Sequence, residues 1–306
     1  MNTPFPPFPC SSCDPPHPVL PPSLRPLRRL AEGPLSEVWE AIPAAGTGDT
    51  VAVKILTAAT PGATARLARE ARLLASLDHP NVRGLCEVVG QGRPEALVLE
   101  YIDGADLGCL AAAGPVPPRI AAWSGFFLTR ALSCLHDRGW VHRDVKPGNV
   151  LISRGGRLLL SDLGLAWPMG VADPPGDDAA AGTPSYLSPE RLDGHPADPR
   201  SDLWSCGVLL YRLLAGRRPF IDGDDGDLLD QIRHRTPHPP AGVPKALARI
   251  VLCCLEKRAE DRFPDADALR AELEDFLSPA SDPATGEHEL AEFFASRSIP
   301  DTMMGV

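Results

Sequence analysis

Oxygen-bearing side chains recur at short intervals in the middle of the chain. Asp144 and Asn149 lie in VHRDVKPGNVL (141–151), and Asp162 follows in LLLSDLG (158–164). Both segments come after helical or strand-like runs, so the three side chains are expected on turns. Carboxylate and amide oxygens suit Mg²⁺, a hard cation that usually shares its ligand sphere with phosphates. The spacing therefore indicates a site for magnesium and phosphate.

The combination of H-R-D-x-x-x-x-N with D-x-G at this separation resembles the protein kinases. An isolated D-x-G means little, but the longer match is specific. The resemblance extends over roughly residues 27–277. VAVK (51–54) corresponds to the strand that carries the family's phosphate-binding lysine, here Lys54. Glu70 lies on the following helix at the position that pairs with this lysine in kinases.

Further matches to the family follow in the expected order. GTPSYLSPE (182–190) resembles the substrate-docking loop and its closing A-P-E, with Ser188 in place of the alanine. SDLWSCG supplies Asp202, the residue that anchors the catalytic loop in kinases. Arg262, in EDRF, is placed to pair with Glu190. The order of these matches argues against coincidence.

The resemblance implies how the work of phosphoryl transfer is divided. Asp162 and Asn149 would hold Mg²⁺, and Lys54 would orient the α and β phosphates of ATP. Asp144 would orient the attacking hydroxyl and accept its proton, while Lys146 would neutralise charge on the transferring group. We therefore expect ATP and Mg²⁺ as the cofactors of the chain.

The same register gives candidates for the adenine pocket. In kinases the ring lies between apolar residues at the positions of Val38 and Ala52 above and Leu151 below. The backbone from Glu100 to Ile102 would form hydrogen bonds with the edge of the ring. Each of these residues is also an ordinary core residue, and only their register with the motifs makes them candidates.

The phosphate-cradling loop departs from the family pattern. In LAEGPLSEV (30–38), Ala31, Gly33 and Ser36 stand where kinases have the three glycines of G-x-G-x-x-G. Pro34 has no N–H, so one of about three backbone hydrogen bonds to the phosphates is lost. The Ser36 hydroxyl offers a replacement. We expect a loop that binds ATP less tightly but still binds it.

Other features resemble the Ser/Thr branch of the family. Lys146 follows Asp144 by two residues, and Thr183 stands in GTPSY, where the family's threonine contacts the catalytic Asp and Lys. EYIDGADL and GRRPF look most like bacterial kinases of eukaryotic type. The resemblance implies transfer of the γ-phosphate of ATP to Ser or Thr hydroxyls of protein substrates, with a role in signalling.

Two rival functions remain open. A pseudokinase or scaffold is favoured by the degenerate loop and disfavoured by the complete set of Lys54, Glu70, Asp144, Asn149 and Asp162. Small-molecule phosphotransferases share H-x-D-x-x-x-x-N but lack the SPE and SDLWSCG elements, which disfavours that class.

The segment between Asp162 and Thr183 contains no Ser, Thr or Tyr. Arg143 directly before the catalytic aspartate marks kinases in which a phosphorylated activation loop commonly fills a basic pocket. We hypothesise that Asp173, Asp177 or Asp178 fills the pocket instead. The alternative is an acidic, mobile loop that leaves Arg143 differently paired.

These motifs require elements that hold them. Residues 27–101 alternate like β-strands around one helical stretch, and residues 102–277 are mostly of helical period. We predict an α+β, bilobal, protein-kinase-like fold with a small, mostly β N-lobe and a larger, mostly α C-lobe. The predicted strands span 38–42, 50–56 and parts of 86–101, and the predicted helices span 63–77, 119–139, 201–216, 228–234, 245–257 and 265–277.

Both ends of the chain differ from this domain. Residues 1–26 are rich in proline and predict a disordered or polyproline-like arm, either a plain linker or a docking segment for a partner. Residues 278–306 are polar except for ELAEFFASR, where Leu290, Phe293 and Phe294 would share one helical face. That helix would either dock or stay loose.

Composition excludes several classes of function. The 306 residues carry a net charge of −10 without a long Lys/Arg run, which disfavours nucleic acid or an anionic membrane as partner. No apolar run approaches the roughly 20 residues of a membrane span, and no signal-peptide pattern opens the chain, so we expect a cytoplasmic protein. Most cysteines lie in apolar segments and are expected to be reduced. Cys10 and Cys13 form a lone C-x-x-C, which favours a mobile tail over a metal site.

Overall fold

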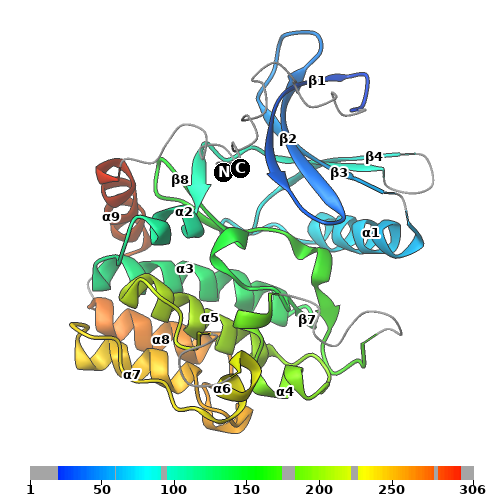
Figure 1. The fold of residues 1–306 in the computed structure, drawn as a ribbon. Helices are drawn as coiled ribbons and strands as arrows, with labels where there is room; N and C mark the ends of the chain where they lie inside the picture. Colours follow the sequence, from blue (N-terminus) through cyan, green and yellow to red (C-terminus); the bar gives the residue numbers. More distant parts are fainter. Residues whose placement is uncertain are drawn as a thin grey trace, which may run out of the picture.

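The computed structural model describes residues 20–58, 60–90, 95–173, 183–221, 227–278 and 282–297. Within these ranges the chain forms two lobes, with a sheet and one helix in the first and mainly helices in the second (Figure 1). This is the predicted α+β, bilobal arrangement. The Pro-rich residues 1–19, Cys10 and Cys13 among them, lie outside the described ranges.

The N-lobe is built on an antiparallel sheet of five strands in the order β1-β2-β3-β5-β4. Trp39, Ala41 and Val53 are buried on its strands. The edge strand β1 alternates between partly buried and exposed residues, whereas β5 is a nearly continuous apolar run that is buried along most of its length. The strands are β1 (Leu24–Glu32), β2 (Ser36–Pro43), β3 (Val51–Leu56), β4 (Leu85–Val89) and β5 (Ala96–Glu100).

The first strand begins at Leu24, three residues before the boundary at 27 that composition suggested. It includes Pro26, which pairs with Ala41 of β2. Pro26 is tolerated because β1 is an edge strand, where a missing backbone donor breaks no second ladder. The register shifts between Pro26 and Arg28. The proline-rich composition of residues 20–26 therefore did not locate the start of the sheet, which begins at Leu24.

The one helix that the structure describes in the N-lobe, α1 (Pro61–Ala75), covers one side of the sheet. Thr60 caps it by accepting a hydrogen bond from the Ala63 N–H at 3.2 Å, and Pro61 fits the first turn, where an N–H has no helical partner. Its apolar face buries Leu67 and Leu74, and Glu70 is buried on the same helix. Capping and amphipathicity together fix where Glu70 lies.

The C-lobe is arranged around α3 and α5, which are buried on almost every side. Trp123 and Phe127 of α3 and Trp204 of α5 are among its largest fully buried side chains. Trp204 stacks on Phe220 with ring centroids 5.8 Å apart. The helices are α2 (Leu107–Ala112), α3 (Pro118–His136), α4 (Pro189–Leu192), α5 (Pro199–Ala215), α6 (Leu228–His234), α7 (Lys245–Cys254) and α8 (Ala266–Leu277).

Short strands and 3₁₀ turns, most of which periodicity did not predict, connect the longer elements. The β8–β9 hairpin separates Asn149, just before β8, from Asp162, just after β9. The strands β7 and β10 pair next to it. These elements are β6 (Gly104–Asp106), β7 (Trp140–Val141), β8 (Val150–Ser153), β9 (Leu158–Leu160), β10 (Trp167–Pro168), and the 3₁₀ turns Pro147–Asn149, Leu163–Leu165, Pro184–Tyr186 and Ala259–Asp261.

The tail carries a docked helix, α9 (Pro283–Ser296), next to α2 and α3 (Figure 1). Leu290 and Phe294 are buried in the main core, and Phe293 is partly buried beside it. Arg119 of α3 donates from Nη2 to Glu289 Oε1 at 2.5 Å. Of the two alternatives for this segment, the structure shows the docked one.

Two glycines allow α9 to approach the lobe closely. A Cβ on Gly156, in the β8–β9 turn, would lie 1.8 Å from the Glu287 carbonyl oxygen. A Cβ on Gly286 would lie 2.5 Å from the Trp123 ring. Both distances are far below van der Waals contact, so each position requires glycine while α9 is docked.

None of the helices in the described part of the chain combines the length and the apolar character that crossing a membrane requires.

Removing a buried contact of α9 should destabilise the protein. We expect Leu290→Ala to lower the free energy of unfolding by about 2–4 kcal/mol, because it removes a fully buried side chain and leaves a cavity. Urea denaturation followed by circular dichroism measures the change. Glu292→Ala is the matched control, since this side chain of the same helix is exposed. Equal losses in both variants would show that α9 does not contribute to the core.

Candidate active site

A cleft between the lobes, with a volume of about 620 Å³, brings most of the predicted site residues together. Its walls come from the β1–β2 turn, β3, α1, the predicted catalytic loop (residues 141–149) and the segment after β9. The predicted residues that line it are Ala31, Gly33, Ser36, Val38, Lys54, Glu70, Asp144, Lys146, Asn149, Leu151, Asp162 and Thr183.

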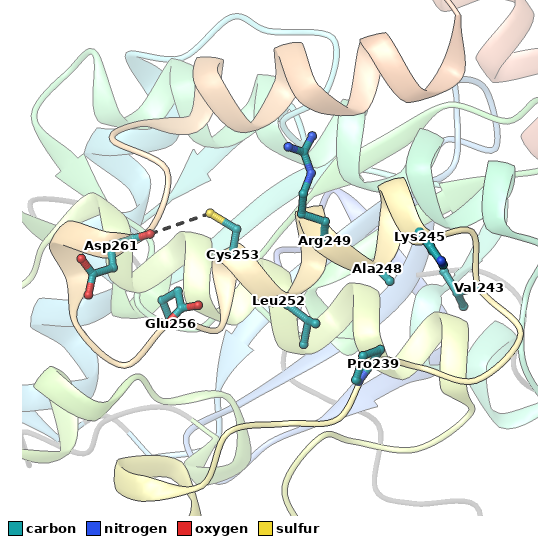
Figure 2. A pocket seen from close by; sticks show the side chains of 9 residues that line it. All are labelled: Pro239, Val243, Lys245, Ala248, Arg249, Leu252, Cys253, Glu256 and Asp261. Carbon is teal, nitrogen blue, oxygen red and sulfur yellow. Dashed lines mark hydrogen bonds between the residues drawn. The ribbon is translucent and has the colours of Figure 1, made fainter.

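Another hollow, of about 770 Å³, lies on the C-lobe along α7 (Figure 2). It is lined by apolar residues such as Leu252, with charged side chains at its margin, and Cys253 Sγ lies 3.8 Å from the Asp261 carbonyl oxygen. None of the predicted site residues lines it. The predicted site residues therefore gather in the cleft between the lobes.

Lys54 is the centre of the cleft's electrostatics. Its Nζ lies 2.6 Å from Glu70 Oε2 and 2.8 Å from Asp162 Oδ1, so the predicted pair with Glu70 is present. Lys54 and Glu70 are 8% and 1% exposed. The ammonium lowers the pKa of Asp162 well below its usual range. Burial works to lower the pKa of Lys54, but the two carboxylates raise it above its usual range.

Asp162 occupies an unusual backbone conformation. Its φ is 59°, in the left-handed region that few residues other than glycine adopt. The neighbouring Leu163 is fully buried in the core, which holds the turn in place. The Asp162 side chain is 48% exposed. One face of the carboxylate therefore meets Lys54 while the side chain stays accessible from the cleft.

The catalytic loop surrounds Asp144 with donors. Lys146 Nζ donates to Asp144 Oδ2 at 2.7 Å, and Asn149 Nδ2 donates to the same oxygen at 2.9 Å. Asn149 Nδ2 also donates to the Asp144 backbone carbonyl at 2.8 Å. The Thr183 N–H donates to Asp144 Oδ1 at 3.2 Å. These contacts fix the orientation of the carboxylate before any substrate arrives.

Asp202 anchors the catalytic loop from below. This fully buried carboxylate accepts hydrogen bonds from the backbone N–H groups of His142 at 2.8 Å and Arg143 at 2.9 Å. His136 Nε2 lies 2.9 Å from it. Burial opposes the charged form, but these hydrogen bonds keep the pKa of Asp202 below its usual value. Arg143 has a φ of 70°, and the bond to Asp202 stabilises this strained conformation.

The predicted pair of Glu190 and Arg262 is also present. Arg262 donates from Nη1 to Glu190 Oε1 and from Nη2 to Oε2, both at 2.7 Å. Burial works against ionisation of Glu190, yet the guanidinium lowers the pKa of this carboxyl. Ser201 of α5 also donates to Glu190 Oε1 at 2.9 Å. The pair thus ties α4, at the end of the substrate loop, to the body of the C-lobe.

Not every predicted adenine contact lines the cleft. Ala52 is fully buried in the core, and Ile102 packs in a small cluster with Leu151 and Leu159. The Glu100 carbonyl accepts a hydrogen bond from Arg83 Nε at 2.9 Å. Because a carbonyl oxygen has two lone pairs, this bond leaves capacity for a second donor. The apolar lining comes from Val38, Leu99 and Leu151.

Sequence reasoning missed Arg83. Its side chain is 6% exposed and lines the cleft beside Leu99. Burial lowers its pKa to about 10, so it stays charged at neutral pH. In the sequence, Arg83 stands between a valine and a glycine, and no helix or strand periodicity predicts that its side chain is buried in the wall of the cleft. Only the bond to Glu100 across the sheet shows why it turns inward.

The β1–β2 turn forms the upper edge of the cleft. The Gly33 N–H donates to the Ser36 carbonyl at 2.8 Å, and the Thr57 N–H donates to the Leu35 carbonyl at 3.1 Å. Gly33 through Ser36 all line the cleft. The turn therefore has the position of a phosphate loop, although Pro34 has no N–H to offer.

Asp173 is the acidic residue that the structure places beside Arg143. Its Oδ1 lies 3.3 Å from Arg143 Nη2. Asp177 and Asp178, the other two residues of that hypothesis, lie outside the described ranges.

Comparison with known proteins agrees with this geometry. The profile described as the protein kinase domain matches residues 24–273. The serine/threonine-protein kinase PkaA of Streptomyces coelicolor is 36% identical over 260 residues, which cover 78% of this chain and 47% of PkaA. The serine/threonine-protein kinase PknA of Mycobacterium tuberculosis is 35% identical over 260 residues, which cover 80% of this chain and 60% of PknA.

A serine/threonine-protein kinase of Myxococcus xanthus is 37% identical over 279 residues, which cover 86% of this chain but 33% of that protein. The chain thus spans between a third and three fifths of the length of these three relatives. The chain belongs to the protein kinase family, and the fold is that of a protein kinase domain.

Breaking the buried pair of Glu190 and Arg262 should destabilise the C-lobe. We expect Arg262→Ala to lower the free energy of unfolding by about 3–5 kcal/mol, because it leaves a mostly buried carboxylate without its partner. Thermal and urea unfolding measure the loss. Arg258→Ala, which removes an arginine from the exposed pair with Glu260, is the control and should change little. A loss no larger than that of the control would contradict the structural role.

The missing donor of the phosphate loop should limit nucleotide affinity. We expect Pro34→Ser to tighten ATP binding by up to about tenfold, because it restores an N–H to the turn at the edge of the cleft where the phosphates are predicted to bind. Isothermal titration with a non-hydrolysable ATP analogue measures Kd. Pro61→Ser, in the first turn of α1 outside the loop, is the control. Unchanged or weaker binding would show that the proline does not limit the loop.

Proposed function

We propose that the chain transfers the γ-phosphoryl group of ATP to Ser or Thr hydroxyls of protein substrates. The observation that carries this proposal is Asp144, held in the cleft by Lys146, Asn149 and Thr183. A hydroxyl that binds near this carboxylate is oriented by it and can pass it a proton. The relatives named serine/threonine-protein kinases support the same class of reaction.

The residues around the cleft fit a magnesium ion. The Asp162 carboxylate is accessible from the cleft. Asn149 donates hydrogen bonds to Asp144 from its amide nitrogen, so its amide oxygen can serve as a metal ligand. These are the hard oxygen ligands that Mg²⁺ prefers. When bound, Mg²⁺ would neutralise charge on the phosphate oxygens. Asp162 and Asn149 are therefore the proposed metal ligands.

The rest of the nucleotide would be held by the upper half of the cleft. Lys54 points its ammonium into the cleft between Glu70 and Asp162, where it would orient the α and β phosphates. The adenine ring would contact Val38, Leu99 and Leu151. The turn at Gly33 to Ser36 would cover the phosphates.

Lys146 and Thr183 favour a protein hydroxyl as acceptor. Lys146 Nζ contacts Asp144 Oδ2, so its charge lies where negative charge develops on the transferred group. Thr183 joins the substrate loop to the catalytic loop through Asp144. This second loop, followed by the Glu190–Arg262 pair, favours a protein substrate over a small molecule.

The pseudokinase alternative is disfavoured by the same contacts. A scaffold has no need to hold Lys54, Glu70 and Asp162 in one charged cluster with the catalytic loop complete below it. A cytoplasmic location, where ATP and Mg²⁺ are available, belongs to the proposal. So does docking of a partner by the Pro-rich N-terminal arm or the C-terminal tail.

Phosphoryl transfer to a generic Ser/Thr protein substrate, measured with labelled ATP and Mg²⁺, tests the proposal. We expect Asp144→Asn to lower kcat by about 10²–10⁴-fold, because it removes the proton acceptor but keeps the shape of the side chain. Asp162→Asn should abolish magnesium-dependent transfer. Asp267→Asn, at an exposed ion pair on α8, is the control and should retain full activity. If the wild-type protein transfers no more labelled phosphate than Asp144→Asn does, the result would favour the pseudokinase.

A further inference from the structure

Asp173 lies between two buried arginines. Its Oδ1 is 3.3 Å from Arg143 Nη2, and its Oδ2 accepts a hydrogen bond from Arg191 Nη2 at 2.5 Å. The side chains of Arg143 and Arg191 are 2% and 4% exposed, and that of Asp173 is 11% exposed. The carboxylate thus bridges two guanidinium groups that water barely reaches.

The two arginines belong to the two loops that a substrate must meet. Arg143 directly precedes Asp144, and its backbone N–H is bound by Asp202. Arg191 lies on α4, next to Glu190, at the end of the substrate loop. A group that holds both guanidinium groups therefore fixes the catalytic loop and the substrate loop relative to each other.

A third contact extends this arrangement to the N-lobe. Trp167 of β10 lies below the guanidinium of Arg69, with Cζ 4.7 Å from the ring centroid, and Arg143 Cζ lies 6.0 Å from the same centroid. Arg69 neighbours Glu70 on α1 and donates to the Gly164 carbonyl at 3.1 Å. Arg143 is thereby connected, through the Trp167 ring and Arg69, to helix α1, which carries Glu70.

Two like charges at low exposure repel each other, and a bridging anion removes that penalty. In switching kinases the anion is a phosphate added to the activation loop, which orders the loop through new pairs with arginine. Here the residues from 163 to 182 contain no Ser, Thr or Tyr, so no hydroxyl is available between Asp162 and Thr183. The anion in the described structure is the side chain of Asp173.

We propose that Asp173 is a positioning residue that holds the catalytic and substrate loops in the active arrangement without phosphorylation of the activation segment. The inference rests on the proposed kinase function and adds the regulation of its site. The kinase is active as synthesised, and its turnover does not depend on a previous phosphorylation.

Substitution of the carboxylate provides a kinetic test. We expect Asp173→Asn to lower kcat/KM for a protein substrate by about 10- to 100-fold, because it removes the charge that both arginines share. KM for ATP should change less than about twofold, since the Lys54 cluster is left intact. Asp173→Glu should recover most of the activity. Glu272→Gln also neutralises a carboxylate paired with an arginine, at a partly exposed position of α8, and serves as the control.

A second arm tests independence from phosphorylation. Wild-type protein treated with a Ser/Thr phosphatase, with removal of phosphate verified by mass spectrometry, should show full activity from the first turnover without a lag. A lag, or loss of activity that returns on incubation with ATP, would overturn the proposal. The proposal would also be overturned if Asp173→Asn were as active as the Glu272→Gln control.

Hydrogen exchange separates this proposal from the proposed function. We expect faster amide exchange of residues 141–149 and 183–192 in Asp173→Asn than in Glu272→Gln, whether or not the protein transfers phosphate. If the wild-type protein has no transferase activity but the two variants still differ in amide exchange, the kinase function is refuted and the positioning role is retained. Equal exchange in the two variants would refute the positioning role.

Discussion

The ammonium of Lys54, held between Glu70 and Asp162, is the contact on which the arrangement of the two lobes depends. It joins β3, α1 and the segment after β9, three parts that are distant in the sequence. Removing water from the Lys54 ammonium and the Glu70 carboxylate is unfavourable unless the two groups meet in good geometry. The cleft therefore exists in a defined shape only when α1 packs on the sheet so that Glu70 reaches Lys54.

A comparable constraint acts beneath the cleft. Arg143 and Asp162 adopt positive φ angles that are unfavourable for side-chain-bearing residues. The first is held by the buried carboxylate of Asp202 and the second by the buried Leu163 beside it. The strain lies in the turns that carry the predicted catalytic and metal-binding side chains, and the packed helices of the C-lobe supply the stability that maintains it.

The sequence predicted the two lobes, most of the longer elements and the pairs Lys54–Glu70 and Glu190–Arg262, because each depends on periodicity or on a specific motif. It did not predict that Arg83 turns into the cleft, since this depends on a hydrogen bond to the Glu100 carbonyl, and it left open whether Ala52 and Ile102 are adenine contacts or only core residues. The short strands β6, β7, β8 and β10 were not predicted because tertiary contacts, and not local periodicity, stabilise them, and β9 was expected only as a helical or strand-like run before Asp162. The predicted catalytic and metal roles follow from the motifs and await measurement.

The close contact between Gly156 and α9 has a consequence for how the chain tolerates change. Gly156 has a φ of 82° in the β8–β9 turn, a conformation that asparagine or aspartate usually tolerates in turns. Here the backbone of Glu287, outside the matched kinase segment, leaves no space for any Cβ. The effect of a substitution at position 156 therefore depends on α9. A side chain that a kinase domain without this helix tolerates at that position is excluded here.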